Sequence, residues 1–122
     1  MTQTERRLYL IAALLKEQPQ FSKIEIPCDK QEQKRLLRSL FNIRMPKPVT
    51  EEFLMVQDAY LKEEIKRKGI TALSDLEPVS KEIYLWRGDI TTLKCDAIVN
   101  AANSQMLGCF CPNHGCIDNV IH

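Results

Sequence analysis

The chain has 122 residues, of which 44% are hydrophobic, and its 17 basic and 16 acidic side chains leave a formal net charge of +1. This length and apolar content are sufficient for one modest hydrophobic core. Because the chain is nearly neutral, it lacks the broad basic field that binds long nucleic acids, although a small anionic ligand needs only local donors. Composition therefore argues against long nucleic acids as partners and leaves the other function classes open.

The hydrophobic run at residues 8–15 follows Arg6 and Arg7, an arrangement superficially similar to a twin-arginine or secretory signal. The run is too short to span a bilayer, and residues 16–19 (Lys-Glu-Gln-Pro) lack the small side chains of a cleavage site. The spacing of one helical stripe is present instead, at Leu8, Ile11, Ala12 and Leu15. We therefore expect an amphipathic helix and no membrane segment.

Residues 1–70 are expected to form a helical N-terminal extension. Thr2, Asp29 and Thr50 are the predicted N-caps of three helices, the first two with a glutamate three residues later, and Gly69 ends the third. Helical spacing predicts the buried positions of the second and third helices: Leu36, Leu37, Leu40, Phe41, Phe53, Val56, Tyr60, Leu61 and Ile65. We assign no chemistry to this extension, which is expected to pack on another part of the protein.

The pattern changes in the segment 71–122, which is expected to form a separate unit. Residues 82–87 are rich in β-branched and aromatic side chains and predict a strand, in which Trp86 is a core residue rather than a ligand platform. Residues 97–99 (Ala-Ile-Val) form a short apolar run, as expected of a central strand covered on both faces by helices. The sequence thus predicts an α/β fold with a parallel sheet.

Two asparagines, Asn100 and Asn103, follow the predicted strand at 97–99. The loops after strand C-termini form the binding crevice of open α/β sheets, and amide side chains suit ribose hydroxyls. Asparagine is also a common turn residue, so the pattern alone leaves a structural role open.

Three of the five cysteines fall near the end of the sequence, together with one of the two histidines: Cys109, Cys111, His114 and Cys116. Such a cluster favours a metal site over disulfides. An odd number of cysteines and the lack of a convincing export signal indicate a reducing, cytoplasmic compartment.

Residues 88–91 (Gly-Asp-Ile-Thr) and 96–103 (Asp-Ala-Ile-Val-Asn-Ala-Ala-Asn) resemble the opening signature of macrodomains, which are ADP-ribose-binding α/β modules. The resemblance covers about residues 83–122 and implies the first part of a three-layer α/β/α sandwich. It implies that the Asp89 side chain and the Ile90 backbone hold the adenine end of ADP-ribose. It further implies that Asn103 lies beside the distal ribose. Asn100, in the same loop, is a further candidate ligand-binding residue on the pattern given above.

Residues 117–122 resemble the helix start of catalytically active macrodomains, with Asp118 at the position of the aspartate that holds the attacking water and Asn119 in place of a glycine. The preceding loop resembles that of the zinc-dependent branch, whose Cys-x4-His-x-Cys set implies three metal ligands: Cys109, His114 and Cys116. Two thiolates and an imidazole suit Zn²⁺, and three protein ligands leave one position open. Cys111 could add a fourth ligand and close the site, but we favour the open set, and we exclude His122 from it.

The resemblance implies a hydrolase that removes ADP-ribose from modified proteins, with a partner sirtuin-type ADP-ribosyltransferase and often a lipoyl-carrier protein as target. Two alternatives stay open: a module that binds ADP-ribose without cleaving it, and a structural zinc module that contacts other proteins. A macrodomain needs further strands and a second phosphate-binding loop, so we expect the sequence to be truncated or incomplete. We also expect the 122-residue chain to be inactive by itself.

Overall fold

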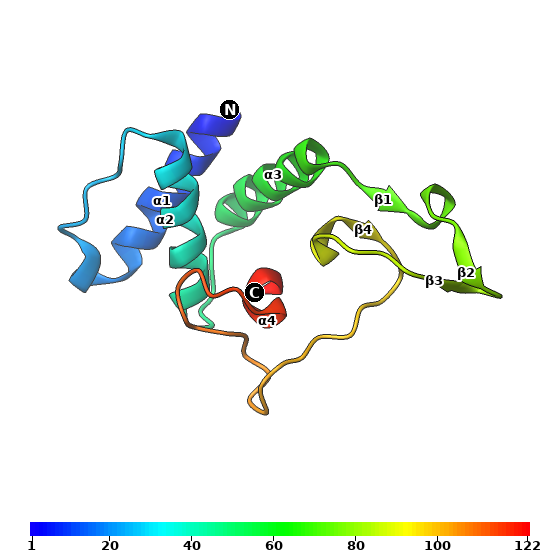
Figure 1. The fold of residues 1–122 in the computed structure, drawn as a ribbon. Helices are drawn as coiled ribbons and strands as arrows, with labels where there is room; N and C mark the ends of the chain where they lie inside the picture. The colour runs from blue at the N-terminus through cyan, green and yellow to red at the C-terminus, as the bar shows by residue number, and fades with distance from the viewer.

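A computed structural model describes all residues, 1–122, as a mixed α/β chain. Three long helices pack together at one end, and short strands and a long loop lead back to a last short helix beside them (Figure 1). The regular elements are α1 (Gln3–Glu17), α2 (Lys30–Ile43), α3 (Glu51–Lys68), β1 (Thr71–Ala72), β2 (Pro78–Ser80), β3 (Ile83–Tyr84), β4 (Leu93–Lys94) and α4 (Ile117–Ile121). None of these helices is long and apolar enough to cross a membrane.

The helix boundaries confirm the predicted caps. Thr2 and Glu5 form a reciprocal capping box at the start of α1. The side chains of Asp29 and Thr50 accept backbone N–H groups at the starts of α2 and α3. Gly69 ends α3 with a φ of 85°, a conformation that glycine adopts without the clash of a side chain.

The hydrophobic core lies between the three long helices. Its nine buried residues are Leu10, Ile11, Leu14, Leu15, Leu37, Leu40, Phe53, Val56 and Tyr60. Since α1 packs against both α2 and α3, its buried face is wider than a single stripe and includes Leu10 and Leu14. The predicted buried faces were wrong at Ala12 and Leu61, which are exposed.

The strands are shorter than predicted. Of the strand expected at residues 82–87, only Ile83–Tyr84 forms β3, which pairs antiparallel with β2. The central strand expected at residues 97–99 is wrong, because this segment pairs with no other strand and Val99 is 89% exposed. A strand needs a neighbour for its backbone N–H and C=O groups, and the 122 residues supply none at this point.

A parallel pairing does occur, between β1 and β4, where Thr71 lies opposite Leu93. This pair and the β2–β3 hairpin are the two sheets of the structure, each with two strands. The three-layer sandwich therefore stays a prediction for the whole protein. Trp86 lies outside the strands, half-buried, with its indole against Gly88.

Beyond β4 the chain runs as a long irregular loop that returns to the helices, so that α4 lies close to α2 (Figure 1). Three side chains of α2 anchor the end of this loop: Arg38, Ser39 and Asn42. Residues more than 70 positions apart in the sequence are thereby brought into contact.

Candidate metal centre

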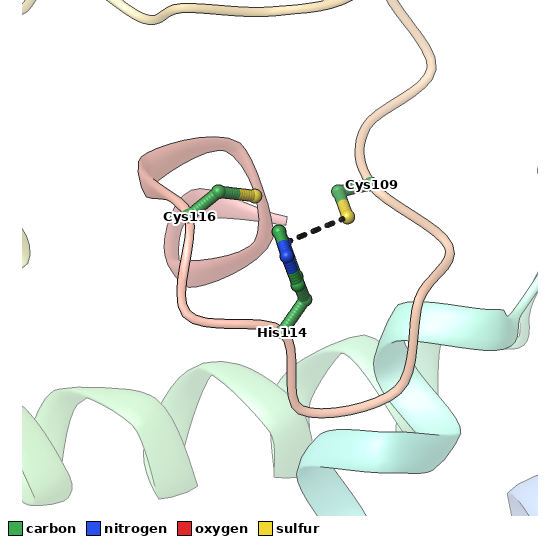
Figure 2. Close-up of side chains that lie close together, drawn as sticks. All are labelled: Cys109, His114 and Cys116. Carbon is green, nitrogen blue, oxygen red and sulfur yellow. Dashed lines mark hydrogen bonds between the residues drawn. The ribbon is translucent and has the colours of Figure 1, made fainter.

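Three side chains converge where the loop enters α4: Cys109, His114 and Cys116 (Figure 2). Their ligand atoms all lie within 4.8 Å of one another. The Cys109 Sγ lies 3.8 Å from the His114 Nδ1. Both sulfurs are half-buried and the imidazole is exposed, so the cluster lies at the surface. Cys111 is exposed and is not among the converging side chains.

The geometry of this cluster fits a zinc ion. Zinc binds cysteine sulfur at about 2.3 Å and histidine nitrogen at roughly 2.0–2.1 Å in a tetrahedral arrangement, so two of its ligand atoms lie roughly 3.5–3.8 Å apart. The separation of 3.8 Å between the Cys109 Sγ and the His114 Nδ1 meets this requirement. Ligand atoms as far apart as 4.8 Å, the largest separation in the cluster, would have to approach by about 1 Å to bind the same ion. Three converging ligands of this kind leave one tetrahedral position free for a further ligand.

Local backbone features place each ligand. Cys116 is the N-cap of α4, and its Sγ accepts the backbone N–H of Asn119 at 3.4 Å. His114 closes a turn in which its N–H donates to the Cys111 carbonyl at 3.2 Å. Cys109 follows Gly108, whose φ of 97° lets the loop change direction before the first ligand.

His122 contacts the loop without joining the converging set. Its ring packs edge-on against Phe110, with centroids 5.0 Å apart, and its Nδ1 lies 3.1 Å from the Cys109 carbonyl oxygen. The expectation that His122 is a packing residue agrees with these contacts.

The predicted catalytic aspartate lies at the start of α4, two residues after Cys116 in the sequence. Asp118 is 6% exposed, and its Oδ1 accepts a hydrogen bond from the Asn100 amide at 2.9 Å. This bond joins the start of the long loop to its end. The structure thus brings together two of the residues that the sequence selected, Asn100 and Asp118.

The Asn103 amide is engaged within its own loop. Its Nδ2 donates to the Gly108 carbonyl at 3.0 Å, and its Oδ1 accepts the Gln105 N–H at 3.1 Å. Asn103 is exposed, and its contact with Gly108 ties it to the residue before Cys109. It makes no hydrogen bond with Asn100 or Asp118.

Asp89 caps the short 3₁₀ turn that contains Ile90. Its carboxylate accepts the Thr91 hydroxyl at 2.6 Å and the Thr91 N–H at 3.0 Å, and it pairs with the Lys68 ammonium at 2.9 Å. The hydroxyl hydrogen bond, followed by the Lys68 interaction, lowers the pKa of Asp89 from 3.8 to about 2 against the opposing effect of burial. Asp89 is therefore a carboxylate at neutral pH.

A cavity of ≈ 570 Å³ lies between α2, α3 and α4. Asp89 and Thr91 line it together with residues 119–122. Its volume is in the range of small-molecule sites. The Cys109, His114 and Cys116 side chains do not line this cavity, so the structure does not join the Asp89 region and these three residues in one pocket.

These features define a mixed α/β chain with a Cys-His-Cys cluster that can hold a metal ion and a nearby cavity of ligand size. The chain is 58% identical over 126 residues to a protein of Treponema medium named protein-ADP-ribose hydrolase, a match that covers 100% of this chain and 48% of that protein. A protein of the same name from Staphylococcus aureus (strain MRSA252) is 47% identical over 115 residues, which cover 93% of this chain and 43% of that protein.

A third relative, from Fusarium oxysporum f. sp. cubense, is named probable bifunctional ADP-ribose hydrolase/ADP-ribosyltransferase. It is 45% identical over 98 residues, covering 71% of this chain and 16% of that protein. The chain thus spans about half the length of these two bacterial relatives. No family model matches the chain.

Proposed function

We propose that this chain is part of a zinc-dependent macrodomain hydrolase that removes ADP-ribose from modified proteins. The observation that carries the reaction is the similarity of the whole chain to proteins named protein-ADP-ribose hydrolase. This name supports an ADP-ribosylated protein as the substrate. The name of the Fusarium relative combines a hydrolase with an ADP-ribosyltransferase, which supports a substrate produced by a transferase of that class.

The convergence of Cys109, His114 and Cys116 supports zinc as the cofactor, because their donor atoms and spacing suit this ion. When bound, zinc supplies a Lewis acid with one coordination position free for a further ligand. Cys111, which is exposed and outside the cluster, leaves that position open in this proposal.

The reaction we propose is hydrolysis of the bond between the distal ribose and a protein side chain, in which water adds a hydroxyl to the ribose and a proton to the side chain. Asp118 holds the attacking water, and the Asn100 amide, 2.9 Å from its Oδ1, fixes the carboxylate. Asn103 orients the distal ribose. Asp89 and the backbone of Ile90 hold the adenine end, a role supported by the position of Asp89 in the cavity wall.

The cofactor is tested by the zinc content of the purified chain, measured by mass spectrometry of the metal. We expect one zinc ion per chain, lost in Cys116→Ser because one of three ligands is removed. Cys111→Ser is the matched control, since it removes a cysteine of the same loop that lies outside the cluster. Equal loss of zinc in both variants would contradict the three-ligand assignment.

The reaction is tested by the release of free ADP-ribose from an ADP-ribosylated protein by the whole protein. We expect release that is abolished by Asn103→Ala and by a zinc chelator. Gln105→Ala is the control and should retain release, because Gln105 is an exposed amide residue of the same loop whose hydrogen bond is made by its backbone N–H and not by its side chain. Binding of ADP-ribose without release would identify a binding module. Absence of binding would favour a structural zinc module.

A further inference from the structure

Asn119 lies at the centre of the contacts between the cysteine-rich loop and α4. Its side chain is 1% exposed, and both hydrogens of its amide are used within the loop. The Nδ2 donates to the Cys109 carbonyl at 3.1 Å and to the Cys111 carbonyl at 2.8 Å. The Asn119 side chain therefore fixes the backbone at both Cys109 and Cys111.

The same residue is linked to the other two members of the cluster. Its backbone N–H donates to the Cys116 Sγ at 3.4 Å. Its Oδ1 accepts a hydrogen bond from Arg38 of α2 at 2.9 Å, and the same guanidinium nitrogen donates to the His114 carbonyl at 3.0 Å. All three cluster residues are thus held by Asn119 directly or through Arg38.

A second residue of α2, Asn42, completes this network. It is 1% exposed, its Nδ2 donates to the Asn119 carbonyl at 3.3 Å, and its Oδ1 accepts the Asn113 N–H at 3.1 Å. Asn113 directly precedes His114 and has a φ of 54°, which asparagine tolerates better than most residues. The contact with Asn42 therefore holds the turn that carries the imidazole.

A role in packing alone does not account for these contacts. A buried amide is favourable only when its polar atoms are paired, and an apolar residue fills the same space without that requirement. Here the Nδ2 groups of Asn119 and Asn42 donate to backbone carbonyls of the cysteine-rich loop and of α4, and the Asn42 Oδ1 accepts a backbone N–H of the loop. These hydrogen bonds therefore fix the backbone conformation of the cysteine-rich loop.

We propose that Asn119, supported by Arg38 and Asn42, is a positioning residue that holds the loop in its metal-binding shape, so that α2 is part of the metal centre. This inference rests on the proposed zinc site. Outer-shell contacts that orient metal ligands typically change metal affinity by about 10–100-fold when they are removed. We expect Asn119→Ala to lower zinc affinity within that range, and Arg38→Ala to lower it less, since Asn119 keeps its bonds to the loop.

The test measures zinc affinity of the full 122-residue chain by competition with a chromophoric chelator, for the unmodified chain, Asn119→Ala and Arg38→Ala. Arg35→Ala is the matched control, because Arg35 is exposed on the same helix and its side chain makes no hydrogen bond or ion pair. The second readout is the visible absorption of the Co²⁺-substituted chain, which reports the number and geometry of thiolate ligands. We expect altered Co²⁺ spectra for Asn119→Ala and Arg38→Ala, an unchanged spectrum for Arg35→Ala, and partial recovery in Arg38→Lys, which keeps a charged donor.

Unchanged zinc affinity and unchanged Co²⁺ spectra in both variants would overturn the inference. If circular dichroism shows that Asn119→Ala unfolds the helices, Arg38→Ala decides the question, because its side chain is exposed. Failure of the unmodified chain to bind either metal would be a different result, since it would remove the zinc proposal and this inference with it.

Discussion

Replacement of Gly108 by alanine is expected to weaken metal binding, because this glycine has a conformation that other residues adopt at a cost. Its φ is 97°, and a Cβ at this position would lie 2.5 Å from the Cγ of the His122 ring. A left-handed conformation costs a residue with a side chain roughly 1–2 kcal/mol, and displacement of the ring adds to this. The metal-free loop can relax to relieve this strain, whereas the metal-bound loop cannot, so the cost falls on the bound form. Since about 1.4 kcal/mol is a tenfold change in an equilibrium constant, we expect zinc affinity to fall by roughly tenfold or more.

The assay is the competition titration with a chromophoric chelator, and Gly115→Ala is the matched control. Gly115 lies between His114 and Cys116, its φ is not in the left-handed range, and a Cβ added there meets no atom within 4 Å. Alanine at this position is therefore expected to leave zinc affinity nearly unchanged. Equal affinities of Gly108→Ala and the unmodified chain would refute the reasoning that this loop conformation is the one that binds metal.

Two further predictions concern the stability of the fold. Leu10 is 0% exposed, so Leu10→Ala is expected to lower the free energy of unfolding, measured in urea, by about 2–5 kcal/mol. Leu54 is 45% exposed, so Leu54→Ala should lower it by less than about 1 kcal/mol. Equal effects of the two variants would contradict the assigned core. The lowered pKa of Asp89, about 2 against 3.8, means that its carboxylate stabilises the fold above pH 3.8 and loses this effect as the pH falls through about 2. The difference in unfolding free energy between the unmodified chain and Asp89→Asn should therefore shrink over this window, and a constant difference would contradict the assignment.

The long helices could be predicted because their signals are local. The helix ends are set by residues that bond to backbone groups of the same turn, such as Thr2, Thr50 and Gly69. The neighbouring sequence is therefore enough to locate each helix end. The buried faces depend on which neighbours each helix meets, and for that reason Ala12 and Leu61 were assigned to the wrong side.

The strand expected at residues 97–99 failed for a related reason. A short apolar run is typical of a buried strand, but the hydrogen-bonding partners of such a strand come from other parts of the chain. In the 122 residues described, no such partner lies beside it. The parallel pairing that does form uses Thr71–Ala72 and Leu93–Lys94, two segments too short to carry a strand signal.

The convergence of the Cys-His-Cys cluster could be expected because its three members lie within eight residues of one another in the sequence. The choice of these three without Cys111 came from the resemblance to zinc-dependent macrodomains, and their role as metal ligands stays a prediction. The contributions of Arg38 and Asn42 could not be predicted, since they act across more than 70 positions. Asn42 lies two positions after Leu40 and five after Leu37, so helical spacing does not place it on their buried face, and the sequence carries no signal for its burial.

The most direct test of this account is X-ray absorption spectroscopy at the zinc edge of the zinc-loaded chain. Ligation by Cys109, His114 and Cys116 predicts two sulfur neighbours at about 2.3 Å and one histidine nitrogen at roughly 2.0–2.1 Å, with a further light atom in the remaining position. A first shell of three sulfurs, which would bring in Cys111, or a shell without sulfur would contradict the proposed centre.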